Sequence, residues 1–260
     1  MHYWNRGLIS TTARTPSYNE ASGIYDLSNQ LVHKHEGRWP VTGGVLTTNL
    51  ALYLDAANSS SYSGSGSTWA DLSGNGNDAT LSGTYSLDST DGGGSMHLNG
   101  GGTTAPVYLT DLNANGGTIE GWVKILTTGG YRHITGWRYN ESAFLLLLTS
   151  PAGSMEVGVS NAGSQAASDI GASTFANNWS HIALTIDIGG NVVYYRNGQA
   201  VVTMTHNGTA FTNSTNQFHL NTSNLGSTNQ KHAVARVYTT VLSASDVLSN
   251  FQAERARFGV

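Results

Sequence analysis

The stretch NNWSHIALTIDIGGNVVYYRNGQAVV, residues 177–202, alternates apolar and polar residues, turns at a glycine pair, and then alternates again. Successive side chains of a strand point to opposite sides, so this alternation predicts strands with two different faces. One face, which we expect to be buried, carries Ile182, Leu184 and Ile186. The other face, which we expect to be wetter, carries His181, Ala183 and Thr185. Asn197 and Gly198 both tolerate a positive φ, which predicts a type I′ turn. The stretch therefore predicts antiparallel strands joined by tight turns, with almost no candidate chemistry of its own.

From Val45 onward the chain repeats this pattern of short strands separated by turns rich in Gly, Asn and Ser. Such spacing is typical of a β-sandwich. The segment AFLLLLTS, residues 143–150, is apolar on both faces and predicts a central strand, with a buried helix segment as the alternative. The predicted strands cover residues 50–54, 95–98, 118–126, 133–137, 144–149, 155–160, 180–188, 192–196, 200–205, 217–220 and 233–238.

Two helices are expected, one near each end of the chain. The segment IYDLSNQLVHKHEG, residues 24–37, predicts a short helix over 27–36, and an isolated helix of about ten residues is marginal in water, so it needs a surface to dock on. The segment LSASDVLSNFQAERARFGV, residues 242–260, predicts a surface helix in which Ser243 and Asp246 form a capping box.

Composition narrows the classes of function. Charged residues make up 11% of the 260 residues, and hydroxyl and amide residues take their place. The formal net charge of −4 and the lack of a Lys/Arg run argue against a nucleic-acid partner, which needs a basic surface. The longest apolar run is too short to span a membrane, and MHYWNRGLIS has no apolar signal core, so we expect neither a membrane partner nor export through a signal peptide. Cysteine is absent, which favours a microbial or viral protein made in a reducing compartment.

Five motifs follow one another between residues 48 and 258. They are the segment 50–83 with its W-x-D-x-SGNGND loop, TIEGWVKI, NNWSHIALTID, VVYYRNGQAV and ARVYTTVLSASDVLSNFQAER. In this order they resemble the laminin-G/concanavalin A-like sandwich family. Together with the strand and helix patterns above, the resemblance implies an all-β, two-sheet antiparallel sandwich (a jelly roll) over residues 45–260, closed by a C-terminal helix. The residue pattern puts an extended arm over 1–44, with one short helix, before it. The resemblance leaves the ligand open, because such folds carry lectins, hydrolases and structural modules.

One stretch departs from the family pattern. Relatives commonly have F-D-G-x-D-D-Y after the third strand, whereas this chain has MHLNGGGTTAPVYL, residues 96–109, without acidic residues. The departure argues against a calcium or sugar role for that loop.

The first 44 residues carry a second resemblance. The segments RGLISTTARTP and EASGIYDLSNQLVHKHEGRWP are similar to the N-terminal segments of structural proteins in tailed bacteriophages, and NFQAERARFGV is similar to chain ends in such proteins. The resemblance implies a virion protein, assembled in the host cytoplasm, whose arm binds other virion proteins or further copies of this chain. The anchoring side chains expected in the arm are Trp4, Ile24, Leu27, Leu31 and Trp39.

A loop in the first sandwich motif offers oxygen atoms of the kind that calcium binds. The candidate ligands are Asp71, Asn75, Asn77 and Asp78. The EF-hand spacing with its distal Glu is missing, and a loop rich in Asn, Asp and Gly also fits a series of Asx turns. Calcium is the one cofactor that the sequence leaves open.

No arrangement of residues predicts catalysis. Glycoside hydrolysis needs two carboxylates about 5 to 10 Å apart beside a cleft, and the tight E-x-D-x-x-E pattern of sandwich-fold glucanases is absent. The glutamates are scattered over Glu20, Glu36, Glu120, Glu141, Glu156 and Glu254. Glu120 lies in a family strand motif, where we expect a structural hydrogen bond. We therefore expect no catalytic residues and no enzymatic activity.

Histidines and one aromatic cluster complete the candidates. His33 and His35 are two apart on the expected helix and point in different directions, which argues against joint metal ligation. His181 is expected to be packed and hydrogen-bonded. The segment GGYRHITGWRYNES could bind a glycan or a protein partner through Tyr131, Arg132, Trp137, Arg138 and Tyr139. The alternative is that Trp137 belongs to the core and the rest are ordinary surface residues.

The sequence thus predicts a structural protein of a tailed-phage virion, such as a head decoration, head fibre, neck or tail appendage. A host-surface glycan is a further candidate partner. The alternative function is a carbohydrate-binding lectin module without a virion role.

Overall fold

The computed structural model describes residues 44–127, 130–137, 143–149, 154–161, 164–172, 176–205, 210–211, 215–222 and 229–260. The side chains of 143–146, 148, 154, 160–161 and 164–172 are left out of the description. The predicted helix over 27–36 and the predicted anchoring side chains of the arm lie outside the described residues.

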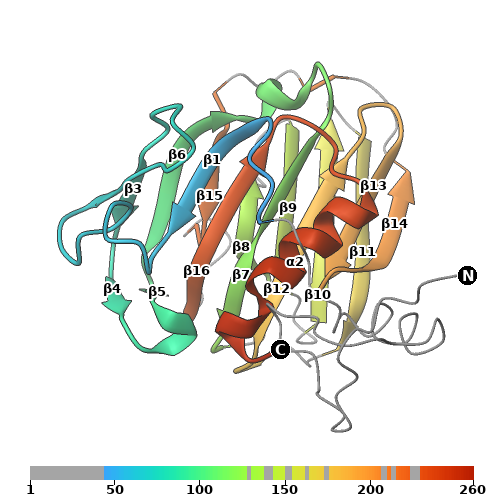
Figure 1. The fold of residues 1–260 in the computed structure, drawn as a ribbon. Helices are drawn as coiled ribbons and strands as arrows, with labels where there is room; N and C mark the ends of the chain where they lie inside the picture. Colours follow the sequence, from blue (N-terminus) through green and yellow to red (C-terminus); the bar gives the residue numbers. More distant parts are fainter. Residues whose placement is uncertain are drawn as a thin grey trace, which may run out of the picture.

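Two antiparallel sheets lie face to face and form a sandwich (Figure 1). The first, which we call the covered sheet, has the order β14-β13-β12-β7-β16-β5-β4, with β1 paired to β16; the second sheet has the order β11-β10-β9-β8-β15-β6-β3-β2. The strands of the covered sheet are β1 (Leu50–Asp55), β4 (Tyr85–Asp88), β5 (Ser95–Asn99), β7 (Gly117–Ile125), β12 (Trp179–Ile186), β13 (Asn191–Arg196), β14 (Gln199–Thr205) and β16 (Asn229–Tyr238). Those of the second sheet are β2 (Thr68–Trp69), β3 (Ala79–Ser82), β6 (Gly102–Tyr108), β8 (Arg132–Trp137), β9 (Ala143–Thr149), β10 (Ser154–Asn161), β11 (Ser164–Ala172) and β15 (Gln217–Leu220). The predicted all-β sandwich is confirmed.

The core lies between the sheets and is built from alternate residues of the strands. Ile182, Leu184 and Ile186 of β12 are buried in it, as their spacing predicts. The Asn197-Gly198 turn between β13 and β14 has φ values of 49° and 76°, which agrees with the predicted type I′ turn. The strand alternative for AFLLLLTS is confirmed, because β9 lies between β8 and β10.

The expected wetter face of β12 is a correction. His181, Ala183 and Thr185 are 0%, 1% and 2% exposed. The reason is the C-terminal helix α2 (Ala244–Phe258), which packs across the outer face of the covered sheet (Figure 1). Phe258 stacks on Trp122 of β7 with ring centroids 4.0 Å apart. The helix begins at the predicted cap, because Ser243 and Asp246 form a capping box.

Five strands were not predicted from the sequence. β2, β3 and β4 are only two to four residues long. β11 has no clear apolar alternation, and β6 begins with Gly102 and contains Pro106, both of which are uncommon in strands. These strands form because neighbouring strands supply their hydrogen-bond partners, which local sequence does not report.

Candidate functional site

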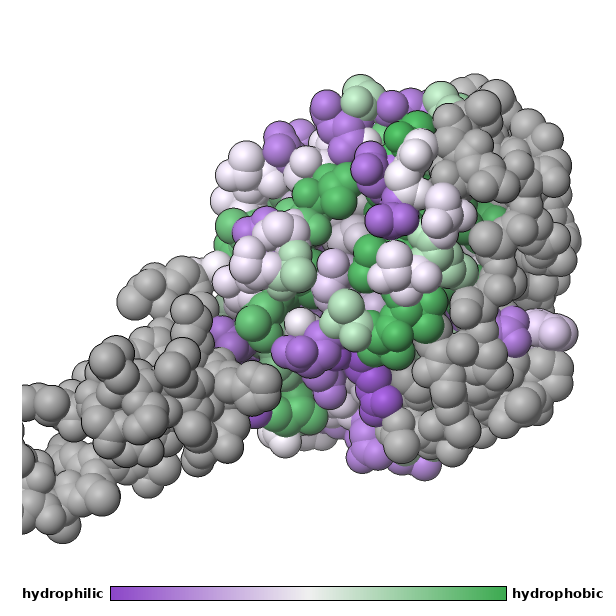
Figure 2. Space-filling model, turned by 90° about the vertical axis from the view of Figure 1, so that its right-hand side faces the viewer, coloured by the Kyte–Doolittle hydropathy of each residue, from purple (hydrophilic) through white to green (hydrophobic). Residues whose placement is uncertain are grey.

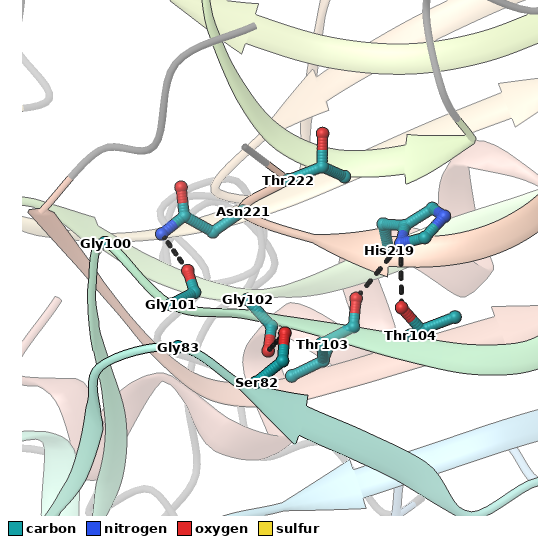
Figure 3. A pocket seen from close by; sticks show the side chains of 10 residues that line it. All are labelled: Ser82, Gly83, Gly100, Gly101, Gly102, Thr103, Thr104, His219, Asn221 and Thr222. Carbon is teal, nitrogen blue, oxygen red and sulfur yellow. Dashed lines mark hydrogen bonds between the residues drawn. The ribbon is translucent and has the colours of Figure 1, made fainter. Parts of the chain in front are cut away.

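A pocket with a volume of about 260 Å³ lies where the turn between β5 and β6 meets the ends of β3 and β15 (Figure 3). Its walls come from three parts of the chain that are far apart in sequence. The lining residues are Ser82, Gly83, Gly100, Gly101, Gly102, Thr103, Thr104, His219, Asn221 and Thr222. None of them carries an acidic or permanently charged side chain.

Close approach of the backbone explains the run of three glycines in the β5–β6 turn. Gly100 has a φ of 82°, in the left-handed region that favours glycine. A Cβ atom on Gly101 would lie 2.4 Å from the carbonyl oxygen of Thr84, and one on Gly102 would lie 2.2 Å from that of Asn221. Any side chain at these two positions would therefore push the turn away from its neighbours and change the pocket.

Hydrogen bonds hold the polar side chains of the pocket in place (Figure 3). The Nδ2 group of Asn221 donates to the carbonyl oxygen of Gly101 at 2.6 Å. The Nδ1 atom of His219 lies 3.1 Å from the Thr104 hydroxyl and 3.2 Å from the Thr103 carbonyl oxygen. The Thr103 hydroxyl accepts from the backbone N–H of Leu220 at 3.2 Å. The pocket is thus built before any ligand arrives.

The chemistry of this pocket suits a small, neutral, hydroxyl-bearing group. Hydroxyl, amide, imidazole and backbone carbonyl groups surround it, and each can exchange hydrogen bonds with an alcohol. Its volume is just below the usual range of ligand pockets, which begins at about 300 Å³. A group about the size of one sugar ring matches both the volume and the polarity.

The sequence did not predict this pocket. It lies in the very stretch, residues 96–109, whose lack of acidic residues argued against a binding role. The one local signal is the Gly100–Gly102 run, which indicates close backbone approach. The contributions of His219 and Asn221 follow only from the pairing of β15 with β6.

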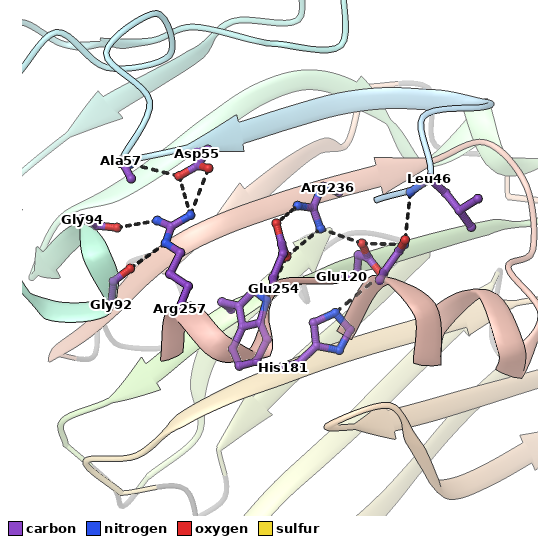
Figure 4. A network of polar contacts seen from close by, with 12 residues as sticks. Leu46, Asp55, Ala57, Gly92, Gly94, Glu120, His181, Arg236, Glu254 and Arg257 are labelled. Atoms are coloured by element: carbon purple, nitrogen blue, oxygen red, sulfur yellow. Dashed lines mark hydrogen bonds and ion pairs between the residues drawn. The ribbon is translucent and has the colours of Figure 1, made fainter. Parts of the chain in front are cut away.

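A second cluster of polar side chains lies buried between the covered sheet and α2 (Figure 4). The Oε1 atom of Glu120 accepts from Arg236 at 2.9 Å and from Asn250 at 3.0 Å, and it lies 3.2 Å from the Tyr238 hydroxyl, whose single proton it shares with the Leu46 carbonyl oxygen. Arg236 also pairs with Glu254 of α2. The predicted structural role of Glu120 agrees with these contacts.

Two neighbours complete this cluster. The indole N–H of Trp122 donates to Glu254 at 2.9 Å, and His181 Nε2 lies 3.6 Å from Glu120 Oε2. The His181 ring packs edge-on against Trp122 with a centroid distance of 5.3 Å, so it is packed as predicted. The expected hydrogen bond is not found, because neither ring nitrogen has a hydrogen-bond partner among the described residues. Burial by itself would raise the pKa of Glu120, but His181, the positive charge of Arg236 and the Asn250 amide lower this pKa to about 2.

Two of the six glutamates therefore come together, on either side of Arg236. The side chain of Glu120 is 0% exposed and that of Glu254 is 12% exposed, so the pair is largely enclosed under α2. Glu156 lies on β10, and Glu20, Glu36 and Glu141 lie outside the described residues.

The buried cluster also holds the first residues of the sandwich. The backbone N–H of Leu46 donates to Asn250 Oδ1 at 2.9 Å, and the Tyr238 hydroxyl donates to the Leu46 carbonyl oxygen at 3.0 Å (Figure 4 marks the position of Leu46). Both polar backbone groups of this residue are thus bound. The chain enters the sandwich at a fixed point beside α2.

The predicted calcium loop is tied to β1 by hydrogen bonds. Asp71 accepts from the backbone N–H groups of Tyr53 and Asn77, at 2.9 and 3.0 Å. Asn75 and Asn77 donate to the carbonyl oxygens of Leu50 and Ala51. Asp78 accepts from the N–H of Asp71 at 2.8 Å. These contacts are those of a loop built from side-chain turns, and calcium binding stays a prediction.

The described part of the chain offers neither a cluster of metal-binding side chains nor a candidate membrane-spanning helix. It contains no group of three or more His, Cys, Asp and Glu side chains placed to hold a metal ion. Nor does it contain a helix that is both long and apolar enough to cross a membrane. His33 and His35 lie outside these residues.

The predicted aromatic surface is divided by the structure. Trp137 is completely buried, donates from Nε1 to the Val107 carbonyl oxygen at 2.9 Å and packs against Phe218, so it belongs to the core and not to a binding surface. Tyr131 is 54% exposed and Arg132 is half-buried at the start of β8. Arg138 and Tyr139 lie outside the described residues.

Comparison with known proteins identifies the fold. A family model described as the concanavalin A-like lectin/glucanases superfamily matches residues 97–248. No curated protein sequence matches this chain.

Solved structures with the same fold include both binding domains and parts of enzymes. The binding domain of Paraclostridial Mosquitocidal Protein 1 has a TM-score of 0.64 and 14% identity, over 79% of this chain and 52% of that one. Domain 4 of AbnA, an arabinanase from Geobacillus stearothermophilus solved with arabinotriose, has a TM-score of 0.61 and 18% identity, over 78% and 98%. The sialidase of Trypanosoma rangeli has a TM-score of 0.61 and 18% identity, over 82% and 34%. This chain thus spans about half of the mosquitocidal binding domain, and at such identities the likeness concerns the fold alone.

Proposed function

The chain belongs to the concanavalin A-like lectin/glucanase superfamily, and from this premise we propose that it is a non-catalytic structural protein of a tailed-phage virion. In this proposal residues 1–44 anchor the chain to other virion proteins or to further copies of itself. Residues 45–260 display a lectin-like sandwich outward, as a head decoration, head fibre, neck or tail appendage.

The observation that carries the proposal is the fixed start of the sandwich. Leu46 is bound through its N–H to Asn250 of α2 and through its carbonyl oxygen to Tyr238 of β16, and both of these side chains are buried between α2 and the covered sheet. A segment that leaves from such a point can bear load between an assembly and the sandwich without loosening the first strand. The resemblance of the arm to phage structural proteins supports the same assignment.

The state of the buried carboxylates supports a non-catalytic role. Glu120 and Glu254 share Arg236, and Glu120 is enclosed among hydrogen-bond donors. General acid and base catalysis needs groups that reach the substrate. These two groups serve the attachment of α2 instead.

A truncation tests the anchoring proposal. A chain without residues 1–40 should keep the far-ultraviolet circular dichroism and cooperative melting of a folded β protein, because the contacts of Leu46 and the core remain. It should no longer join particles when it replaces the full chain in an infected host. Normal incorporation of the folded, truncated chain would refute the proposal.

A second candidate function, glycan binding, is favoured by the neutral pocket beside the β5–β6 turn. A glycan array followed by calorimetry on the best ligand measures it. Thr104→Val removes a pocket hydroxyl and should weaken binding about tenfold, which corresponds to one hydrogen bond of about 1.4 kcal/mol. Thr80→Val is the matched control, since Thr80 pairs with Thr104 from the neighbouring strand β3 and does not line the pocket. Equal losses in both variants, or no array signal with the full chain, would remove this candidate.

A further inference from the structure

Strand β14 forms one edge of the covered sheet and lacks the usual protection of an edge. Within the described part of the chain it pairs with β13 alone. Its sequence, QAVVTMT, contains neither a charged residue nor a proline. An unpaired strand edge presents free backbone N–H and carbonyl groups, and natural proteins usually shield such edges with charges, prolines or very short strands.

The other sheet edges show that shielding. β2 is two residues long. β4 is four residues long and ends at Asp88, which forms an ion pair with Lys231. β11, the edge strand of the second sheet, has one charged residue in its sequence, Asp169. β1 pairs with β16 alone among the described strands, and the loop over 71–77 covers it through hydrogen bonds to Leu50, Ala51 and Tyr53. β14 is therefore the long, uncharged exception among the described edges.

The side chains of β14 are also open to solvent. Five of its seven residues are exposed, and one of these is the apolar residue Val201, which is 45% exposed. Val202 and Met204 point the other way and pack on the core. Figure 2 looks onto the side of the molecule where β14 lies, and the described residues there mix hydrophobic and hydrophilic areas.

We propose that β14 pairs antiparallel with β14 of a second copy of this chain, so that the two covered sheets continue into one another across a twofold axis. A register shift at Val201 bends the start of the strand, which places the pairing stretch at residues 202–205. A twofold axis at Thr203 would set Thr203 opposite Thr203 of the second copy and Val202 opposite its Met204.

A second copy fits this edge better than an unrelated strand. Self-pairing brings only uncharged side chains opposite one another, so the formal net charge of −4 on each copy meets no like charge at the seam. Val202 and Met204 lie on the core side of the strand, and continuing the sheet would extend that apolar face. An isologous contact of this kind closes after two copies, which avoids open-ended fibres. The inference does not depend on the proposed virion role.

The test is sedimentation of the full chain over a wide range of concentrations. The wild-type chain should form a dimer. Thr203→Lys should raise the dissociation constant about tenfold or more, since two lysines would then lie beside the twofold axis. Thr80→Lys is the matched control, because Thr80 is an exposed threonine on β3, which has partners on both sides, and it should leave the dimer unchanged.

Hydrogen exchange on the wild-type chain gives a second measurement that needs no variant. The amides of residues 202–205 should become more protected as the concentration rises, while those of β4 at the opposite edge should not change. A wild-type chain that stays monomeric, equal dissociation constants for both lysine variants, or protection that is independent of concentration would overturn the proposal.

Discussion

Arg236 links the outer face of the covered sheet to the helix that packs on it. It is completely buried and joins Glu120 of β7 to Glu254 of α2. Removing one partner of a buried ion pair costs far more than the pair contributes, because a charge is left without a partner in a poorly solvated place.

We therefore expect Arg236→Met to lower the free energy of unfolding by about 3 to 5 kcal/mol. The measurement is denaturant unfolding followed by fluorescence. Arg255→Met in the same helix is the control: Arg255 is half-buried, donates to the Val260 carbonyl oxygen and lies over the Phe251 ring, and its loss should cost less, about 1 kcal/mol. Similar losses in the two variants would contradict the assigned role of Arg236.

The low pKa of Glu120 makes stability depend on pH in one direction. The pKa of this carboxyl is about 2 in the folded chain, below the ordinary value of 4.5. A lowered pKa contributes stability that is complete above the ordinary value and is lost as the pH falls through the folded value. The pKa of Asp91, which burial by itself would raise, is also lowered to about 2, by Lys231, Lys124 and Trp179, and acts in the same sense.

Unfolding free energies measured between pH 6 and pH 2 should thus fall with acidification. Glu120→Gln should be less stable at neutral pH and should lose less of its stability on acidification, by on the order of 3 kcal/mol, because it no longer has this carboxylate to protonate. A pH dependence identical to that of the wild-type chain would contradict the account of Glu120.

At the scale of elements, the close approach of three strand ends forms the pocket. Gly102 begins β6 directly against β15, and a Cβ there would lie 2.2 Å from the carbonyl oxygen of Asn221. Gly102→Ala should therefore separate the two strands and cost about 1 to 3 kcal/mol of unfolding free energy. Thermal and denaturant unfolding measure the loss, and Gly44→Ala is the control because nothing lies within 4 Å of its Cβ position. Equal unfolding free energies for the two variants would contradict this prediction, because they would show that β6 and β15 can separate without a loss of stability.

The elements also show what the sequence could and could not predict. The alternation in residues 177–202 gave the strands and turns correctly, because strand periodicity and turn preferences are local properties. The expected wetter face of β12 was wrong because α2, which follows the last strand in sequence, returns to cover it. The sequence left Trp137 open between surface and core for a different reason, since aromatic residues suit both places.

The pocket was missed because its parts meet only through long-range pairing. The glycine run at 100–102 indicated close backbone approach, but nothing local indicated that β15 would supply the facing wall. Similarly, the five motifs predicted the family, while the partner of Glu120 in α2 depended on how the helix crosses the sheet.

At the scale of the whole molecule, the described residues separate three regions. The covered sheet and α2 form a closed face, held by the Arg236 cluster and by the contacts of Leu46 with that cluster. The polar pocket lies at the β5–β6 turn, and the uncharged β14 edge lies at the end of the sheet order away from β4 and β5. Anchoring, ligand binding and self-pairing would therefore use different parts of the sandwich.

Quantitative mass spectrometry of purified, salt-washed virions tests the central claim most directly. An anchored structural protein should be present at a fixed copy number per particle: hundreds for a shell decoration, or about six to eighteen for a neck or tail position, since virion parts have closed symmetry. Absence of the chain from washed particles, with the protein found only free in the lysate, would contradict the account.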